Sequence, residues 1–290
     1  MRICMKNEGD THTKLVEASP DLLGPTGPAR IAKVYKHALW CDGKTSSPFS
    51  SLVKVGQVMS GFLAVLSDPG QQATLEEFHD WYNNEHIPLR LHHLKSFLSG
   101  ARYAAADGKQ PGWLAMYEVE SVSAFQDPSY TILREKRSDR ERELIQRLGV
   151  LDRRTCEVVY DSGKDNAKGT GMNVGNPSTF VVTVEIPTRP EESTFNNWVQ
   201  RLSSVEQWAR IRVVKALDKA ITAVDESLKR VDVLDYLAVI EFVSKPGHVD
   251  QATIDAWLAS YTDKTGQWRV WDLYKAYPCV GNGDDFKTHL

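Results

Sequence analysis

The chain has 290 residues and a mass of 32.6 kDa, and 41% of its residues are hydrophobic, which is enough to bury one large core or two ordinary ones. Lys and Arg number 35 against 38 Asp and Glu, a net charge of −3. No basic block interleaves with aromatic residues, which argues against a nucleic-acid partner. No apolar run reaches the roughly 18 residues of a membrane span, and a signal-peptide core is absent. We therefore expect a soluble, cytoplasmic protein.

Residues 1–57 are rich in Gly, Pro, Ser and Lys and show little periodicity. The run Gly24-Pro25-Thr26-Gly27-Pro28 interrupts any regular element, although a short helix fits 29–39. We interpret 1–57 as an N-terminal extension that is poorly ordered or lies over the surface.

Residues 58–162 are predicted to form a β-α-β-β-α-β unit. The apolar run at 62–66 ends at Asp68-Pro69-Gly70, as a buried strand before a turn does. Thr74 and Glu77 form a capping box that starts a helix, and Pro88 is expected to end it. The remaining elements are strands at 96–106 and 112–119, a helix at about 130–148 whose charged residues face solvent, and a strand at 154–160. This order is ferredoxin-like.

The same order recurs at 178–280, after a glycine-rich linker at 163–177, and 281–290 is a tail. The segment 236–242 parallels 113–119 position by position, and a helix at 194–202 follows a strand at 179–184. We therefore predict an α+β fold in which two tandem ferredoxin-like halves form one barrel, because an isolated half would leave one sheet face bare.

The first helix carries the ionisable groups of interest. On a wheel at 100° per residue, Phe78, Trp81, Tyr82 and Glu85 share one narrow sector, which is the pattern of a buried face. Glu85 is then expected among aromatic rings, where an unpaired carboxylate is costly. His79 falls on the flank of this face.

The second helix serves as an internal comparison. Trp198 matches Trp81, and Leu202 stands where the first helix has Glu85. The second helix contains no histidine. The first half thus carries a carboxylate where the fold accepts a hydrocarbon, and this marks Glu85 and its neighbour His86 as candidates for a site.

A purely structural interpretation stays open. Glu85 can pair with Arg90 across the helix end, and His86 can stabilise the last turn through the helix dipole. Adjacent histidines after a proline, here His92 and His93, are typical of a surface loop.

Motifs of other site classes are absent. His79, Glu85 and His86 are of metal-ligand type, but their spacing does not match the helical zinc pattern, so no metal is expected. The four cysteines include no CxxC pair and are expected to be reduced thiols. No GxGxxG, Walker or GxSxG motif points to a nucleotide or a serine hydrolase.

Residues 77–90, EFHDWYNNEHIPLR, resemble the EthD family of dimeric α+β barrel proteins. FLSGARY at 97–103 and PGWLA at 111–115 are similar to its fungal members. The resemblance covers about 61–161, fades in the second half and does not reach 1–57. It implies a ferredoxin-like barrel of the dimeric α+β type, and His86, in the His-Ile-Pro element, as the acid/base residue. Similar barrels include cofactor-free cyclases, dehydratases, decarboxylases and monooxygenases of polyketide-like aromatics.

These observations predict a lyase or cyclase that needs no cofactor and acts on a small aromatic or polyketide-like molecule. His86 exchanges a proton next to a carbonyl, and Glu85 sets its tautomer or acts as the acid. Arg90 or Arg102 stabilises an enolate, and His79 is a further catalytic candidate. The substrate is expected in an apolar cavity between helix and sheet, lined by Trp81, Tyr82, Arg102, Tyr103, Trp113 and Tyr117.

Other classes stay open. A cofactor-free monooxygenase would use the same cavity, and a binding protein would hold a hydrophobic metabolite there without changing it. A structural barrel would fill the cavity with its own side chains. The sequence does not decide whether the fused halves also form a homodimer.

Overall fold

The computed structural model describes residues 2–5, 14–17, 59–163, 172, 176–258 and 267–277. The chain divides into two units, Met1–Val55 and Gly56–Leu290. In the first unit, β1 (Arg2–Met5) and β2 (Lys14–Glu17) form an antiparallel pair that the sequence did not predict. The helix expected at 29–39 and the tail at 281–290 lie outside the described residues, as does most of the linker at 163–177.

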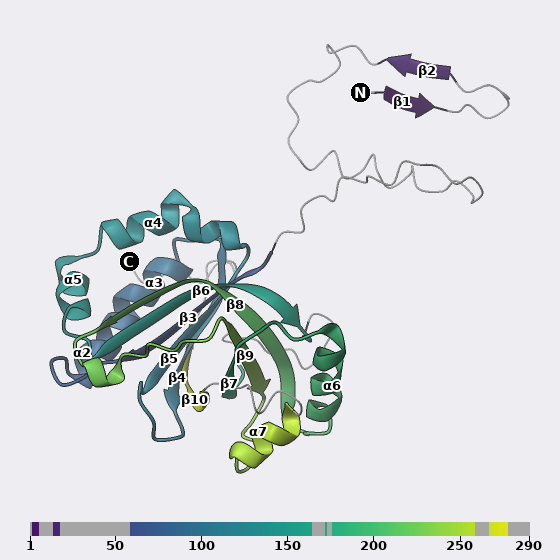
Figure 1. Ribbon diagram of the computed structural model, residues 1–290. Coiled ribbons are helices and arrows are strands. Elements are labelled where there is room, and N and C mark those ends of the chain that lie inside the picture. Colours follow the sequence, from purple (N-terminus) through teal and green to yellow (C-terminus); the bar gives the residue numbers. More distant parts are fainter. Residues whose placement is uncertain are drawn as a thin grey trace. The chain divides into compact units, whose positions relative to one another are not determined.

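Eight antiparallel strands of the second unit close a barrel in the order β10-β4-β5-β3-β6-β8-β9-β7 (Figure 1). The strands are β3 (Gly61–Asp68), β4 (Phe97–Ala105), β5 (Trp113–Val119), β6 (Val150–Asp161), β7 (Phe180–Ile186), β8 (Trp208–Ala223), β9 (Tyr236–Phe242) and β10 (Trp268–Tyr277). The helical segments are α2 (Leu75–Trp81), η4 (Tyr82–His86), α3 (Ile87–Leu91), η5 (Val122–Gln126), α4 (Pro128–Glu135), α5 (Asp139–Ile145), α6 (Glu192–Leu202), η6 (Glu226–Leu228) and α7 (Gln251–Trp257).

Each half of the barrel arranges its four strands in the same way. Counted along the chain, the order across the sheet is second, third, first and fourth in both halves. The halves join where β6 pairs with β8 and β10 pairs with β4. The fourth strand of each half therefore pairs with the second strand of the other, and no barrel strand has an open edge. The predicted mixed α+β class and closed barrel are confirmed.

Strand alternation separates three apolar clusters. One cluster fills the barrel interior and includes Phe62, Tyr103 and Trp271. A second joins the outer face of the first half to its helices and includes Phe78, Trp81 and Tyr117. A third does the same in the second half and includes Phe195, Trp198 and Trp257. The helices α2 to α5 thus cover one stretch of the outer face, and α6 and α7 cover another (Figure 1).

The helix predicted at about 130–148 is two helices. α4 ends at Glu135, and a new helix, α5, begins at Asp139. The Oγ atom of Ser138 accepts a hydrogen bond of 3.0 Å from the main-chain N–H of Glu141, which is the N-cap that starts a helix. The prediction that the whole charged stretch faces solvent is wrong for Glu141, which is 2% exposed.

Gly70 allows the turn after β3 to pack against another backbone segment. Its φ is +66°, and a Cβ atom there would lie 2.7 Å from the Cα of Gly149. Gly108 has a nearly equal φ of +67°, but a Cβ there would meet no atom within 4 Å. Gly108→Ala is expected to lower the free energy of unfolding by about 1 kcal/mol, the cost of the left-handed backbone alone. Gly70→Ala adds a backbone clash and is expected to cost about 1–3 kcal/mol more.

Urea denaturation of the two glycine variants measures this difference. Equal losses at the two positions would contradict the close backbone approach.

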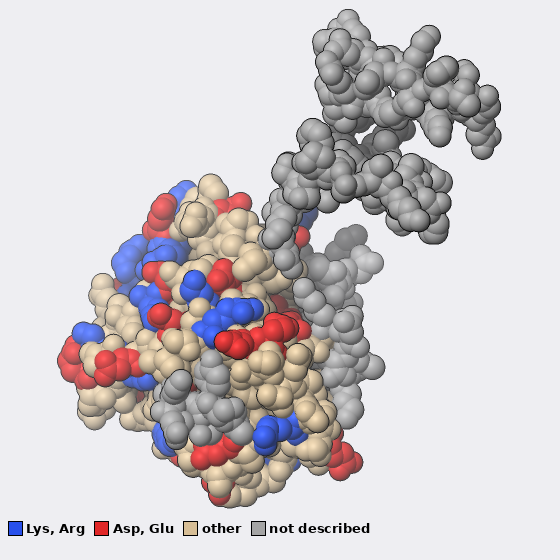
Figure 2. Space-filling view, turned by 45° about the vertical axis from the view of Figure 1, so that its right-hand side comes forward, with Lys and Arg blue, Asp and Glu red and all other residues tan. Residues whose placement is uncertain are grey.

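The surface carries charges of both signs. On the face seen in Figure 2, Lys and Arg side chains are interspersed with Asp and Glu. Among the described residues, none of the helices has the length and hydropathy that a membrane span requires.

Candidate active site

The helix that carries the predicted site changes geometry halfway along. α2 is followed by the π-helical turn η4, in which the N–H of Ile87 bonds to the carbonyl of Tyr82, five residues back. The wider turn shifts every later residue by about one position relative to a regular helix. Pro88 does not end the helix as predicted. It lies in the first turn of α3, where its missing N–H costs little, and helix continues to Leu91.

Because of the π-turn, His86 takes the buried position predicted for Glu85, and Glu85 faces outward. The His86 residue is 9% exposed, and its ring centroid lies 4.4 Å from that of Trp81 and 5.2 Å from that of Tyr82. Glu85 instead is turned outward and accepts a hydrogen bond from Oγ of Ser138. The prediction that Glu85 lies among the aromatic rings is therefore wrong, because the wheel assumed 100° per residue throughout.

The comparison between the two halves changes accordingly. α6 is a regular α-helix over Glu192–Leu202, and both Trp198 and Leu202 are fully buried. With one extra residue in the π-turn, the counterpart of Leu202 is His86. The residue that replaces a hydrocarbon is thus a histidine.

The partner of His86 is a carboxylate that sequence reasoning missed. Nδ1 of His86 lies 3.0 Å from Oε1 of Glu141, whose side chain is 2% exposed. Nε of Arg137 lies 3.7 Å from the same oxygen. Arg90, expected to pair with Glu85, donates instead to the main-chain carbonyl of His86 over 2.6 Å. The spacing of Ser138 and Glu141 marks a helix start, but it carries no sign that Glu141 is buried against another helix.

Burial keeps the imidazole of His86 neutral. Burial and, to a smaller extent, the charge of Arg90 lower its pKa from 6.5 to about 4, against the opposing hydrogen bond with Glu141. Burial alone would raise the pKa of Glu141, but the hydrogen bond from His86 and the nearby arginines outweigh it and leave that pKa below its ordinary value. At neutral pH a carboxylate therefore accepts from Nδ1–H of a neutral ring, and the lone pair lies on Nε2.

This depressed pKa makes folding stability depend on pH. Between pH 6.5 and about 4 the unfolded chain binds a proton at His86 and the folded chain does not, so stability is full above pH 6.5 and is lost as pH falls towards 4. At about 1.4 kcal/mol per pKa unit, the loss reaches at most about 3 kcal/mol. Urea denaturation between pH 7 and about 4.5 is expected to show this slope, and His86→Asn should reduce it.

Two other histidines enter the same comparison. The pKa of His79 is also lowered, so His79→Asn is expected to reduce the slope as well. His93 is exposed, and His93→Asn is the control. A slope that His86→Asn leaves unchanged would contradict the buried neutral ring.

Arg102 organises a second cluster on the outer face of β4. Its guanidinium lies 4.2 Å from the ring centroid of Tyr82 and 5.2 Å from that of Trp113. Its Nη2 atom lies 3.0 Å from Nδ1 of His79. Burial, followed by the charge of Arg102, lowers the pKa of His79 to about 4, so the neutral ring accepts this hydrogen bond. Tyr82 contacts Arg102 and also His86, and therefore links the two histidines.

The predicted lining residues do not all share one face. Tyr103 follows Arg102 on β4 and therefore points to the opposite face. It lies in the barrel interior and donates a hydrogen bond of 3.1 Å to the carbonyl of Ser178. The grouping of Tyr103 with Arg102 is thus wrong. Trp81 and Tyr117 do lie on the helix side, and the indole nitrogen and phenol oxygen are buried without a hydrogen-bond partner among the described residues.

The predicted aromatic cavity is filled by side chains in this structure. Trp81, Tyr82 and Tyr117 are each at most 1% exposed, and the guanidinium of Arg102 packs over several of the rings. The side chain of His86 keeps 11% of its surface exposed.

Comparisons with known proteins show a likeness of fold. No protein-family model and no curated protein matches the chain. An anthrone oxidase-like protein of known structure matches 78% of this chain and 95% of its own, with 13% identity and a TM-score of 0.50. The fold is of the dimeric α+β barrel type. Here a single chain supplies both halves of the barrel.

More distant dimeric α+β barrels include a presumed monooxygenase from Fusobacterium nucleatum subsp. nucleatum, which matches 76% of this chain and 94% of its own at 11% identity and a TM-score of 0.41. A mutant chlorite dismutase from Candidatus Nitrospira defluvii matches 75% of this chain and 92% of its own at 10% identity and a TM-score of 0.40. At such identities the likeness concerns the fold and does not select a reaction.

The last barrel strand contributes residues to the site that sequence reasoning missed. The ring of Tyr274 stacks on His79 with centroids 4.6 Å apart and planes at 17°. The hydroxyl of Tyr277 donates to Oδ1 of Asn83, and burial raises the pKa of Tyr277 to about 12. The repeat predicted this closing strand, but only the pairing of β10 with β4 across the dimeric α+β barrel brings it to the first half. Within the described ranges, no three His, Cys, Asp or Glu side chains are grouped to hold a metal ion.

Proposed function

We propose that the protein is an enzyme that acts on a small aromatic or polyketide-like molecule, with His86 as its acid/base group. The observation that carries the proposal is the buried pair of His86 and Glu141 at the π-turn, with Nδ1 and Oε1 3.0 Å apart. A carboxylate that fixes the tautomer of a neutral imidazole leaves Nε2 ready to accept a proton. π-turns are frequent at functional sites, and the equivalent helix α6 is regular.

The proposed chemistry is proton transfer next to a carbonyl. Nε2 of His86 removes a proton from carbon, and Glu141 stabilises the imidazolium that forms. Arg90 is 5% exposed, and its positive charge beside the pair stabilises the enolate. Return of the proton to a departing hydroxyl completes a dehydration, and return to a new alkoxide completes an aldol cyclisation. Protonation of the carbanion left after loss of CO₂ completes a decarboxylation. None of these steps needs a cofactor.

The surrounding side chains support an aromatic, carbonyl-bearing substrate. The indole N–H of Trp81 and the phenol of Tyr117 are buried and lack a partner among the described residues, and such donors are normally satisfied. A substrate carbonyl oxygen is an acceptor for either of them. Tyr82, Trp113 and Arg102 then provide flat surfaces for an aromatic ring. Binding requires Tyr82 and Arg102 to move apart, because they now pack together.

We also propose that the chain is a member of the EthD family whose two halves, 58–162 and 178–280, are diverged copies of one ferredoxin-like unit. The sequence at 77–90 supports the family. The shared strand order of the two halves supports the duplication. Equivalent helix positions also carry the same buried aromatic residue in both halves, Phe78 and Phe195 at one position and Trp81 and Trp198 at another.

A cofactor-free monooxygenase is the second candidate. The solved structure with a TM-score of 0.50 is described as anthrone oxidase-like, and the same base would serve that chemistry. Removal of a proton from an anthrone-type CH₂ group by His86 yields a carbanion that reacts with O₂. One oxygen atom stays in the product as a new carbonyl, and the other leaves as water with the two hydrogens of the CH₂ group.

Product analysis tests the proposal and separates the candidates. The purified full chain is incubated with a panel of poly-β-carbonyl and anthrone-type compounds, with and without O₂, and products are identified by mass spectrometry. Products formed equally without O₂ indicate a lyase or cyclase, and products that need O₂ indicate the monooxygenase. Product formation that persists unchanged in His86→Asn, or bound substrate without any product, would contradict His86 as the acid/base group.

A further inference from the structure

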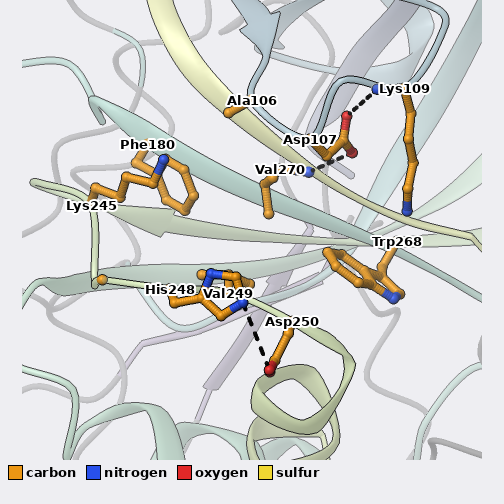
Figure 3. Close-up of a pocket in the computed structure, with 11 residues that line it drawn as sticks. Ala106, Asp107, Lys109, Phe180, Lys245, His248, Val249, Asp250, Trp268 and Val270 are labelled. Atoms are coloured by element: carbon orange, nitrogen blue, oxygen red, sulfur yellow. Dashed lines mark hydrogen bonds and ion pairs between the residues drawn. The ribbon is translucent and has the colours of Figure 1, made fainter.

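A second cleft lies where the two halves of the barrel meet, beside the paired strands β4 and β10, and shares no residue with the His86 site. It has a volume of about 420 Å³ and lies between the β4–β5 turn, the start of β10 and the segment that follows β9 (Figure 3). This volume is within the lower part of the range for small-molecule sites. It suits a ligand of one or two rings.

The walls of this cleft are flat and apolar. Phe180 and Val270 are 1% and 6% exposed, so their positions are held by the core of the second half. The partly buried indole of Trp268 stands at the opposite side in Figure 3. Rigid aromatic walls favour a planar ligand, since offset or edge-on ring contacts gain more than area burial alone.

Two lysines line the cleft, and each is held over an aromatic wall. Nζ of Lys109 lies 4.4 Å from the ring centroid of Trp268, and Nζ of Lys245 lies 5.4 Å from that of Phe180. Neither ammonium group forms an ion pair with a carboxylate of the described residues. Cation–π contact orients an ammonium group without neutralising its charge.

The two acidic residues of the cleft already have partners. Asp107 accepts hydrogen bonds from Nε of Arg269 at 2.8 Å and from the main-chain N–H groups of Lys109 and Val270. Asp250 caps α7 by accepting from N and Oγ1 of Thr253. His248 lies nearby, with Nε2 3.8 Å from Oδ2 of Asp250. Among the described residues, the carboxylates of the cleft have partners and its two ammonium groups form no ion pair. The cleft therefore offers positive charge to a ligand.

We propose that this cleft binds a small planar aromatic carboxylate. The ring lies between Phe180 and Trp268, and the carboxylate contacts the ammonium group of one of the two lysines, Lys109 or Lys245, which stand on opposite sides of the cleft (Figure 3). This site is independent of the reaction proposed for His86 and lies between the two halves of the barrel.

Calorimetric titration of the full chain tests the proposal with 2-naphthoate and its neutral analogue 2-naphthylmethanol. Naphthoate is expected to bind at least about tenfold more tightly than the alcohol, because only the carboxylate pairs with a lysine. The double variant Lys109→Met, Lys245→Met should weaken naphthoate binding by about tenfold or more and leave the alcohol unchanged. Lys229→Met removes an exposed lysine that pairs with Glu226 and is the matched control.

Three outcomes would overturn the site. They are no saturable heat up to about 1 mM naphthoate, equal affinity for acid and alcohol, and unchanged affinity in the double lysine variant. Titration of His86→Asn separates this site from the proposed enzyme. Its naphthoate affinity is expected to equal that of the wild type, and a loss of binding there would assign the ligand to the helix-side site instead.

Discussion

His86→Asn is expected to lower kcat by a factor of about 10² to 10⁴ on any substrate that the product analysis identifies, because that is the usual contribution of one acid/base group. Asparagine is the informative replacement. Its amide nitrogen can take the place of Nδ1 and keep a hydrogen bond to Glu141, while the basic Nε2 is lost. His86→Ala would instead leave Glu141 without this partner and open a cavity beside Trp81, so lost activity and lost folding would be confounded.

Glu85→Gln is the matched control for His86→Asn. Glu85 precedes His86 in the same π-turn but faces outward to Ser138, so this variant should retain kcat within about twofold. The free energy of unfolding of His86→Asn is expected to be about 1–2 kcal/mol lower than that of the wild type. Circular dichroism checks that the variant is folded. Comparable activity losses in the two variants would indicate that the π-turn is needed only for structure.

Arg154→Met is expected to lower the free energy of unfolding by about 3–5 kcal/mol, the cost of removing one partner of a buried ion pair. Arg154 points into the barrel and bonds to Asp152 and, at 2.8 Å, to Glu185. The three side chains are 2%, 4% and 4% exposed. Glu185 keeps a second partner in Arg230, but Asp152 would be left as a buried charge. Urea denaturation at neutral pH measures the loss.

The neighbouring arginine supplies the control. Arg153 points to the outside of the same strand, and its partner Asp218 is 59% exposed, so Arg153→Met should cost no more than about 1 kcal/mol. The double variant Arg154→Met, Asp152→Leu removes the charge pair together and should recover much of the stability. Equal losses for the two single arginine variants would contradict the buried network.

The charged residues inside the barrel distinguish this core from that of the helix layers. Arg212 bonds to Glu241 and Glu118, and Arg154 bonds to Asp152 and Glu185. A barrel interior held by such pairs leaves little space, and the cavity bounded by Arg154 and Glu185 has only about 10 Å³. The interior is therefore a packed core, and the candidate sites lie on the outer face.

Local patterns in the sequence determined most of the elements. The apolar run at 62–66 predicted β3 because a strand buried on both faces needs no alternation. Thr74 predicted the start of α2 because its hydroxyl accepts from the N–H of Glu77, as it does at 3.1 Å. The shared pattern of the two halves predicted the barrel. His86 also emerged as a candidate from the sequence.

Only the tertiary structure decided which groups surround His86. A helix wheel assumes one geometry throughout, so it assigned the buried position to Glu85 and could not foresee the π-turn. Glu141 belongs to a charged stretch that is typical of a solvated helix, and it is buried only because α5 packs against the π-turn. Tyr274 reaches His79 because β10 pairs with β4 from the other half of the chain. Sequence periodicity reports the local face of an element, whereas the partner of that face is set by long-range packing.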